Sequence, residues 1–337
     1  MPRNVYIPKC IDDLFANDQL ISVHVFGDKA KQFNSNEQFC DFLKEKKLGV
    51  KQFGTDIECF EEVTKLEYFY NRLKANPNFI QNFTVLAVVD GKMYTQIQNA
   101  PCILYKNASG DLEMSTAKAH LEKDHVLPMI YKKCYKFLME IHKHGIYYGD
   151  IKCKNIFVNI ENNSQEIKAE DILIGDYGSL RSYDTRANSI INNYVFTFMT
   201  PMSESFVKFW RPGGHGYNYG VRTRLREISK NNPRINYIFS TETLRRVKET
   251  WQDVYDDHVI NESDSISSNE IDPSIFFAKA NDWFHFGIAM IEFITFIQNE
   301  ALYSEIDAIF KVFCESPIMD DKEVRVRQSN YNEPTKN

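Results

Sequence analysis

The sequence lacks the features of a secreted, zinc-binding or membrane-spanning protein. Its seven cysteines are odd in number and widely spaced, and they include no C-x-x-C pair. This spacing argues against a disulfide framework and a zinc site, and it favours a reducing compartment. The first residues contain no apolar signal core. The longest apolar run, 283–297, is too short to cross a bilayer and contains His285 and Glu292. We therefore expect a soluble cytoplasmic protein with no membrane partner.

The chain also has no overall excess of positive charge. Its 40 Lys and Arg residues face 46 Asp and Glu residues, which gives a net charge of −6. We therefore do not expect nucleic acid as a partner. Positive charge is nevertheless concentrated in 211–248, and an acidic stretch follows at 253–272. The basic stretch 211–248 is a candidate docking surface for an acidic or phosphorylated partner, and the alternative is an ordinary solvated face.

The chain is long enough for a two-lobed enzyme, with 337 residues, of which 43% are hydrophobic and 14% aromatic. The predicted fold is α+β. Residues 1–106 form a small lobe rich in strands, and residues 107–327 form a larger, mainly helical lobe. Residues 328–337 are polar and are predicted to be a disordered tail.

The small lobe is predicted to contain strands and one helix. Two β-rich runs lie at 21–26 and 48–53, and a hairpin with a D-G turn is expected within 84–97. Between them, apolar residues recur at intervals of three and four over 56–74, which predicts an amphipathic helix.

The larger lobe is predicted to begin with a strong helix over 126–144, which Gly145 ends. Two short apolar segments follow at 156–160 and 172–174 and predict a small hairpin. The segment 281–298 is apolar on nearly all sides, which predicts a helix buried in the core.

A group of polar residues lies on the loop between the helix 126–144 and the first strand of that hairpin. Asp150 is followed two residues later by Lys152 and five residues later by Asn155, and the sequence I-G-D-Y-G places Asp176 after the second strand. Phosphoryl transfer needs these residue types. One carboxylate orients and deprotonates the attacking hydroxyl, a lysine neutralises phosphate charge, and an amide oxygen and a second carboxylate hold Mg²⁺.

This pattern resembles the eukaryotic-type protein kinases, whose catalytic loop reads H-R-D-x-K-x-x-N and whose metal motif reads D-F-G. The resemblance implies that Asp150 is the catalytic base and that Lys152 contacts the γ-phosphate. It also implies that Asn155 and Asp176 bind Mg²⁺, for which Mn²⁺ could substitute, with ATP as cosubstrate and a protein as acceptor. The combination of G-D-I-K with D-Y-G is most similar to the vaccinia-related and casein-kinase-like branch, and Lys152 is typical of Ser/Thr specificity.

Two further segments extend the resemblance. The sequence N-D-W-F-H-F-G at 281–287 resembles the family's S-D-V-W-S-F-G, which opens the buried central helix of the large lobe. By this likeness Asp282 caps that helix and holds the catalytic-loop backbone. The sequence G-V-K-Q-F at 49–53 resembles A-V-K on a strand of the small lobe, which implies that Lys51 contacts the α- and β-phosphates of ATP.

In the family, Lys51 would pair with a glutamate of the following helix, and the positions four and seven residues later face the core. From Glu62 these positions hold Leu66 and Phe69, which are both apolar. From Glu67 they hold two polar residues. Helical geometry therefore favours Glu62, with Glu67 as the alternative.

The sequence departs from the family pattern in several places. It contains no G-x-G-x-x-G, and only Gly27 stands where the phosphate loop is expected. Tyr148 and Gly149 replace the His and Arg of the catalytic loop. The A-P-E motif is degenerate, with 198–202 as its nearest equivalent, and a stretch at 203–277 is read as a large insertion.

Three functions fit these observations. The leading one is a Ser/Thr protein kinase, and a pseudokinase that regulates a partner is the first alternative. The second alternative is a kinase-fold enzyme with a non-protein acceptor or a nucleotidyl-transfer reaction, because Y-G-D is similar to the H-G-D of aminoglycoside and choline kinases. The insertion and the composition, rich in Asn, Ile and Phe, favour a divergent viral or bacterial effector kinase in the cytosol of a eukaryotic host.

Overall fold

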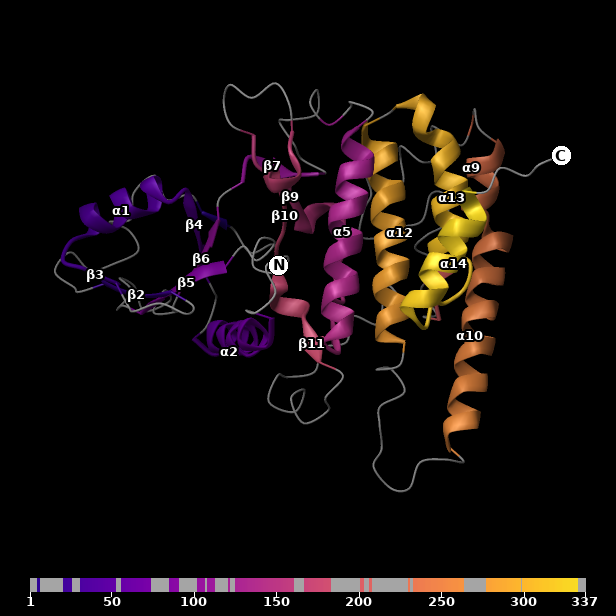
Figure 1. Ribbon diagram of the computed structural model, residues 1–337, viewed down its shortest axis with the longest axis horizontal. Coiled ribbons are helices and arrows are strands. Elements are labelled where there is room, and N and C mark those ends of the chain that lie inside the picture. The colour runs from indigo at the N-terminus through magenta and orange to yellow at the C-terminus, as the bar shows by residue number, and fades with distance from the viewer. Residues whose placement is uncertain are drawn as a thin grey trace.

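Figure 1 shows the computed structural model of the chain, in which a sheet-rich part and a helical part lie at opposite ends of the long axis. The predicted α+β, two-lobed fold is confirmed. The structure describes residues 5–6, 21–25, 31–52, 56–73, 85–90, 102–106, 108–112, 121, 125–160, 167–182, 201–202, 206–207, 230, 233–263, 277–297 and 299–332.

Six of the described strands form one antiparallel sheet in the small lobe, in the order β1-β4-β6-β5-β2-β3. Their bounds are β1 Val5–Tyr6, β2 Ile21–Val25, β3 Lys31–Phe33, β4 Leu48–Gln52, β5 Val85–Asp90 and β6 Cys102–Lys106. The strands predicted at 21–26 and 48–53 are β2 and β4. The hairpin predicted within 84–97 is corrected in part, since β5 pairs with β2 and with β6, where Val88 lies opposite Ile103. Residues 91–97 lie outside the described residues.

Two of the described helices accompany this sheet. Helix α2, Asp56–Leu73, is the amphipathic helix predicted from the sequence, and its apolar residues Leu66 and Phe69 are fully buried. Helix α1, Asn36–Glu45, was not predicted. It begins at Ser35, whose hydroxyl accepts from the backbone of Gln38 at 3.2 Å, so the start of this helix has a standard N-cap.

The larger lobe is built from helices that run side by side (Figure 1). Their bounds are α5 Val126–Lys143, α9 Pro233–Ile238, α10 Thr241–Ser263, α12 Ala278–Ile297, α13 Tyr303–Phe313 and α14 Asp321–Asn332. Helix α12 is buried along almost its whole length, as its apolar sequence predicts. At Gly287 it packs so closely on α13 that a Cβ there would lie 2.7 Å from Phe313 Cβ.

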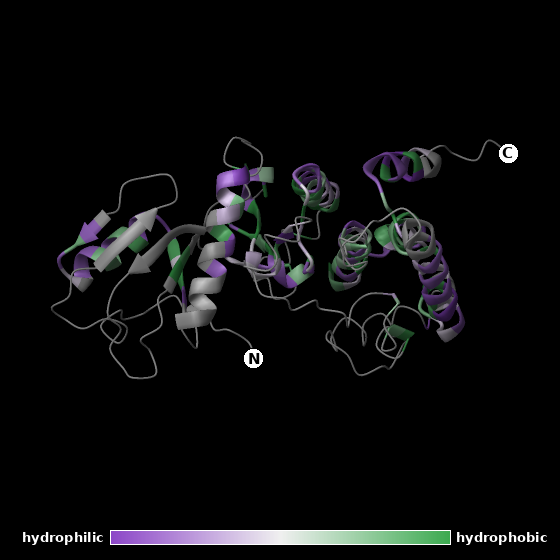
Figure 2. Cartoon of the chain, turned by 90° about the horizontal axis from the view of Figure 1, so that it is seen from below, coloured by the Kyte–Doolittle hydropathy of each residue, from purple (hydrophilic) through white to green (hydrophobic). Residues whose placement is uncertain are grey.

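Part of the range predicted as an insertion belongs to the hydrophobic core. Helix α10 buries Trp251, whose indole nitrogen donates to the carbonyl of Cys314 at 3.2 Å and whose ring lies 5.6 Å from that of Phe284. Figure 2 shows why the helix is hard to recognise in the sequence, because α10, at the right-hand edge of the molecule, is largely hydrophilic. Its few apolar residues form only a narrow stripe.

The predicted tail is corrected at its start. Helix α14 continues to Asn332, so residues 328–332 are helical, and 333–337 lie outside the described residues. Arg327 anchors the helix by donating to the three carbonyls of Val312, Ser316 and Pro317. These bonds satisfy carbonyls at the end of α13 and in the loop that follows it.

Two short sheets lie where the two lobes meet and carry the polar loops. The first has the order β10-β9-β7, and in it Ile174 lies opposite Ile156, which confirms the predicted hairpin. The second pairs β11 with β8. The bounds of these strands are β7 Gly110–Asp111, β8 Ile146–Tyr147, β9 Ile156–Val158, β10 Ile172–Ile174 and β11 Arg181–Ser182. The bounds of the short 3-10 helices are η2 Cys153–Asn155, η3 Ala169–Asp171, η4 Tyr177–Ser179 and η6 Glu300–Leu302. Among the residues that the structure describes, no helix is long and apolar enough to cross a membrane.

Candidate active site

The loop that follows β8 is fixed by Asp282, a fully buried carboxylate in the first turns of α12. Its two oxygens accept from the backbone nitrogens of Tyr148, at 2.8 Å, and of Gly149, at 2.7 Å. His142 of α5 contacts the same carboxylate at 2.9 Å. Gly149 has a φ of 76°, a left-handed conformation that favours glycine. Asp282 therefore lies against the backbone of the loop, as predicted. It does not cap α12, however, because the helix begins four residues earlier, at Ala278.

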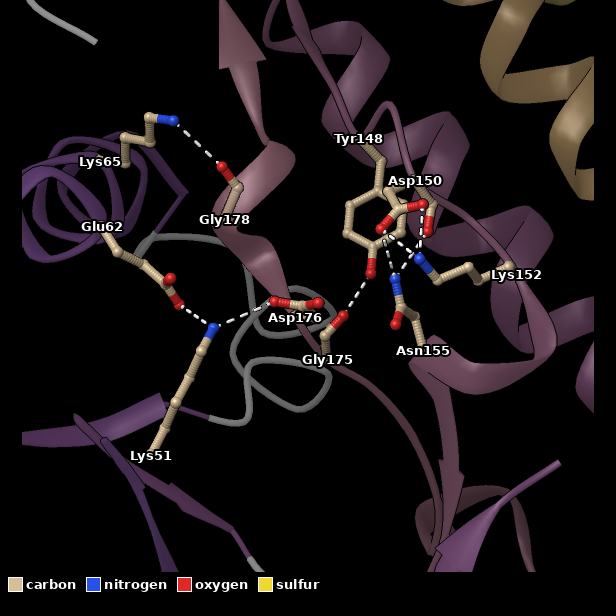
Figure 3. A network of polar contacts seen from close by, with 10 residues as sticks. All are labelled: Lys51, Glu62, Lys65, Tyr148, Asp150, Lys152, Asn155, Gly175, Asp176 and Gly178. Carbon is tan, nitrogen blue, oxygen red and sulfur yellow. Dashed lines mark hydrogen bonds and ion pairs between the residues drawn. The ribbon is translucent and has the colours of Figure 1, made fainter. Parts of the chain in front are cut away.

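Asp150 and its neighbours form a tight polar group on this loop (Figure 3). Lys152 donates to both carboxylate oxygens of Asp150, at 2.9 and 2.7 Å. The amide nitrogen of Asn155 donates to the Asp150 carbonyl at 2.8 Å and to its carboxylate at 3.0 Å. Burial raises the pKa of Asp150, and the positive charge of Lys152 opposes this effect. The structure thus brings together the three loop residues that the sequence singled out.

Asp176 follows β10 and lies beside this group because β9 and β10 are paired. The backbone nitrogen of Gly175 donates to the carbonyl of Asn155 at 3.0 Å, so the residues after β10 and before β9 are neighbours. Asp176 itself has a φ of 57° and a ψ of 63°. This left-handed conformation is uncommon for a residue other than glycine and is often found at functional sites.

Lys51 of β4 connects the small lobe to the metal motif. Its ammonium group lies 2.6 Å from Glu62 Oε1 on α2 and 3.1 Å from Asp176 Oδ1. The side chains of Lys51 and Glu62 are only 6% and 4% exposed, whereas that of Asp176 is 46% exposed. The structure therefore pairs Lys51 with Glu62, and the side chain of Glu67 lies outside the described residues. Figure 3 shows Lys51 between the two carboxylates.

Several site residues have no counterpart in the sequence predictions. Lys65 of α2 donates to the carbonyl of Gly178 at 3.0 Å, and Arg72, two turns later, donates to Ser182 at 3.3 Å. A Cβ on Gly178 would lie 3.2 Å from Glu62 Oε2, so the segment passes very close to α2. The only available signal was that Lys65 and Arg72 are seven residues apart and therefore share a helix face.

The residues present fit a magnesium ion. Both hydrogen bonds of the Asn155 side chain to Asp150 use its amide nitrogen, so the amide oxygen is turned away from Asp150 (Figure 3). That oxygen and the carboxylate of Asp176 are hard donors of the kind that Mg²⁺ prefers. No group of three or more His, Cys, Asp or Glu side chains in the described part of the chain could hold a metal alone. Mg²⁺ that is bound together with a nucleotide usually keeps phosphate oxygens and water among its ligands.

Other predicted features cannot be placed. Gly27, the segment 198–200 and the first half of the basic stretch lie outside the described residues. The part of that stretch that is described includes Arg245 and Arg246, which are exposed on α10. Arg246 lies 3.9 Å from Glu315 in a surface ion pair.

The lobes and the site together define a protein-kinase-like fold, in which a strand lysine pairs with a helix glutamate beside a D-Y-G motif and a catalytic-loop carboxylate. No protein-family model matches the sequence, and no curated protein matches it. Two solved structures from Toxoplasma gondii match most of the chain. One is a specific rhoptry antigen kinase domain, with a TM-score of 0.44, 10% identity, and coverage of 95% of this chain and 88% of that chain. The other is ROP2, described as a virulence factor with a protein-kinase fold and no enzymatic activity, with a TM-score of 0.38, 9% identity, and coverage of 94% and 86%. Because both scores are below 0.5, the fold assignment rests on the chain's own lobes and site contacts.

Proposed function

We propose that the chain is a protein kinase that transfers the γ-phosphate of ATP to a Ser or Thr hydroxyl of a protein, with Mg²⁺ or Mn²⁺ as the metal. The observation that carries the proposal is the pair of contacts made by Lys51. A buried lysine that bonds Glu62 in one lobe and Asp176 in the other joins two segments 125 residues apart. Apolar residues at these positions would stabilise the fold at a lower cost in free energy, because burying charges is unfavourable. The charges therefore indicate a functional role.

The proposed roles follow from position and charge. Asp150 accepts the proton of the acceptor hydroxyl. At the same time the hydroxyl oxygen forms a bond to the γ-phosphorus, and the bond between that phosphorus and the bridging oxygen breaks, which releases ADP. Lys152 lies beside Asp150 and offers positive charge to the transferring phosphate. Lys51, fixed by Glu62, offers positive charge to the phosphates that remain on ADP. Asn155 and Asp176 are the residues that would hold Mg²⁺, which when bound would neutralise phosphate charge in the transition state.

The raised pKa of Asp150 suits this role. A general base works best when its pKa lies closer to the operating pH than that of an ordinary carboxylate. Burial supplies the shift, and Lys152 limits it. Since Lys152 donates to both carboxylate oxygens, Asp150 must exchange one of these bonds for the acceptor hydroxyl. Lys152 can then turn towards phosphate without leaving the site.

Two finer points, the specificity for Ser or Thr acceptors and the branch of the protein kinases, are proposed from the sequence. Lys152, two residues after the catalytic aspartate, supports Ser/Thr acceptors, and G-D-I-K with D-Y-G supports the vaccinia-related and casein-kinase-like branch. A cytosolic location is supported by the cysteines. Those in the described part of the chain, Cys40, Cys134, Cys153 and Cys314, are not in disulfides, as expected in a reducing compartment.

The alternative is a pseudokinase, and one observation favours it. Both oxygens of Asp150 are engaged by Lys152, and Asn155 adds a further bond, so the carboxylate is well satisfied without a substrate. In that case the same site would bind nucleotide and present a surface to a partner.

Incubation with ATP, Mg²⁺ and a generic acceptor protein, followed by mass analysis of the acceptor, tests the proposal. A mass increase of one phosphate that is lost in Asp150→Asn supports it. An increase of one AMP would replace it with nucleotidyl transfer. An unmodified acceptor together with a Mg²⁺-dependent rise in unfolding temperature on adding ATP would favour the pseudokinase, because binding to the native state stabilises it.

A further inference from the structure

Two buried tyrosines donate to consecutive backbone carbonyls just before the metal motif. The phenol of Tyr148 bonds the carbonyl of Gly175, and the phenol of Tyr177 bonds the carbonyl of Ile174. Both side chains are fully buried, and their rings pack edge to face with centroids 6.1 Å apart. Figure 3 shows the first of these bonds, with the Tyr148 hydroxyl pointing at Gly175 beside Asp176.

Tyr148 connects the catalytic loop to the metal motif. Its phenol bonds the carbonyl of Gly175, the residue before Asp176. Burial raises the pKa of Tyr148 well above its usual value, and the nearby charges of Asp176 and Asp150 raise it further.

The backbone conformation of Asp176 is one that its surroundings must hold in place. Its left-handed backbone, with φ of 57° and ψ of 63°, is disfavoured for a side chain with a Cβ, and it persists only where the surroundings impose it. The residue before it is fixed at both ends, because Gly175 donates through its nitrogen to Asn155 and accepts through its oxygen from Tyr148. The carbonyl of Ile174 is fixed in turn by Tyr177.

We propose that Tyr148 and Tyr177 form a phenol clamp that holds Asp176 in the conformation that binds the metal ion. Both tyrosines are then positioning residues, since neither touches the reacting atoms. This inference rests on the proposed function, because it assumes that Asp176 binds a divalent cation together with nucleotide. A buried tyrosine commonly bonds some acceptor for its own sake, so the test must separate metal binding from stability.

The test compares Tyr148→Phe, Tyr177→Phe and the double variant with wild-type protein. Tyr131→Phe is the matched control, because the Tyr131 phenol accepts from Gln328 between α5 and α14 and its ring lies 5.1 Å from that of Phe286. The readout is the Mg²⁺ concentration that gives half of the ATP-dependent rise in unfolding temperature, which requires no turnover. Loss of one hydrogen bond that favours the metal-binding conformation of Asp176 over its alternatives should raise this concentration about fivefold. Tyr131→Phe should leave it within about twofold.

The outcomes separate a failure of the clamp from a failure of the proposed function. If wild-type protein responds to Mg²⁺ and ATP but neither single variant changes the half-saturating concentration, the clamp is overturned and the proposed function stands. A lower unfolding temperature without a change in Mg²⁺ dependence also counts against the clamp, because it shows structural support alone. If wild-type protein shows no Mg²⁺-dependent response, the proposed function fails and the clamp fails with it. Should the double variant not fold, the single variants carry the test.

Discussion

The ion pair between Lys51 and Glu62 should be strongly coupled, and a double-mutant cycle can measure the coupling. Both side chains are almost fully buried, at 6% and 4% exposure, and their charged atoms are 2.6 Å apart. Removing one partner of a buried ion pair costs about 3–5 kcal/mol, because the other charge stays buried. The conservative changes Lys51→Met and Glu62→Gln keep most of the volume of each side chain.

The structure sets different expectations for the two changes. After Glu62→Gln, Lys51 keeps Asp176 at 3.1 Å and gains an amide oxygen as acceptor, so the loss should be near 2 kcal/mol, below the usual range for a broken buried pair. Lys51→Met removes the shared cation from both carboxylates and should cost about 3 kcal/mol. The double variant has no unpaired charge at this position and should be more stable than the sum of the single effects predicts, by at least about 1 kcal/mol.

Urea unfolding of the four proteins measures these free energies. Glu67→Gln, the same change on the same helix, is the control and should shift the free energy of unfolding by no more than about 0.5 kcal/mol. Additivity of Lys51→Met and Glu62→Gln to within about 0.5 kcal/mol would refute the pairing. So would equal effects of Glu62→Gln and Glu67→Gln.

Three further changes test other parts of the molecule. Lys65→Met removes the bond to the Gly178 carbonyl and should lower the rate of phosphate transfer several-fold with little change in unfolding temperature, while Lys65→Arg should retain most of the rate. Gly287→Ala places a Cβ 2.7 Å from Phe313 Cβ, and calorimetry should show a loss of about 1–3 kcal/mol. Asp150→Asn should abolish transfer yet raise the unfolding temperature at neutral pH, because burial raises the pKa of Asp150 and its ionised form therefore opposes folding. This advantage should disappear as the pH falls below the ordinary pKa of 3.8, and a persistent difference at low pH would contradict it.

Local sequence patterns were sufficient where a segment's environment is simple. Helix α12 is apolar on every side because it is surrounded by other helices, and that composition identifies it directly. The choice of Glu62 over Glu67 needed only helical geometry, since Leu66 and Phe69 follow at core-facing positions and are fully buried. The hairpin β9–β10 has two short apolar strands separated by a short polar stretch of sequence, which is a local signal.

Other elements depend on contacts that a local pattern does not contain. Strand β5 lies between β2 and β6, so its pairing is decided by the whole sheet and cannot be read from the D-G dipeptide at its end. Helix α10 buries Leu244, Val247 and Trp251 on one stripe, but its many charges obscured this spacing. Helix α1 could have been found, because Ser35 and Gln38 have the spacing of an N-terminal capping box.

The tyrosines show the same limit at the site. Tyr148 and Tyr177 stand at positions where the family pattern has His and Phe, and the sequence does not predict which groups their phenols bond. Their bonds to Gly175 and Ile174 depend on the close approach of two loops. That approach results from the pairing of β9 with β10 and from the support of Asp282 beneath the loop.

The most direct test of the account is transfer of labelled γ-phosphate from ATP to an acceptor protein in the presence of Mg²⁺, by wild-type protein and by Asp176→Ala. The account predicts transfer by the wild-type protein that requires the metal and falls to background in Asp176→Ala, because that change removes a proposed metal ligand and one carboxylate partner of Lys51. Transfer that continues undiminished in Asp176→Ala would contradict the account, since the phosphates would then be held by a different part of the molecule.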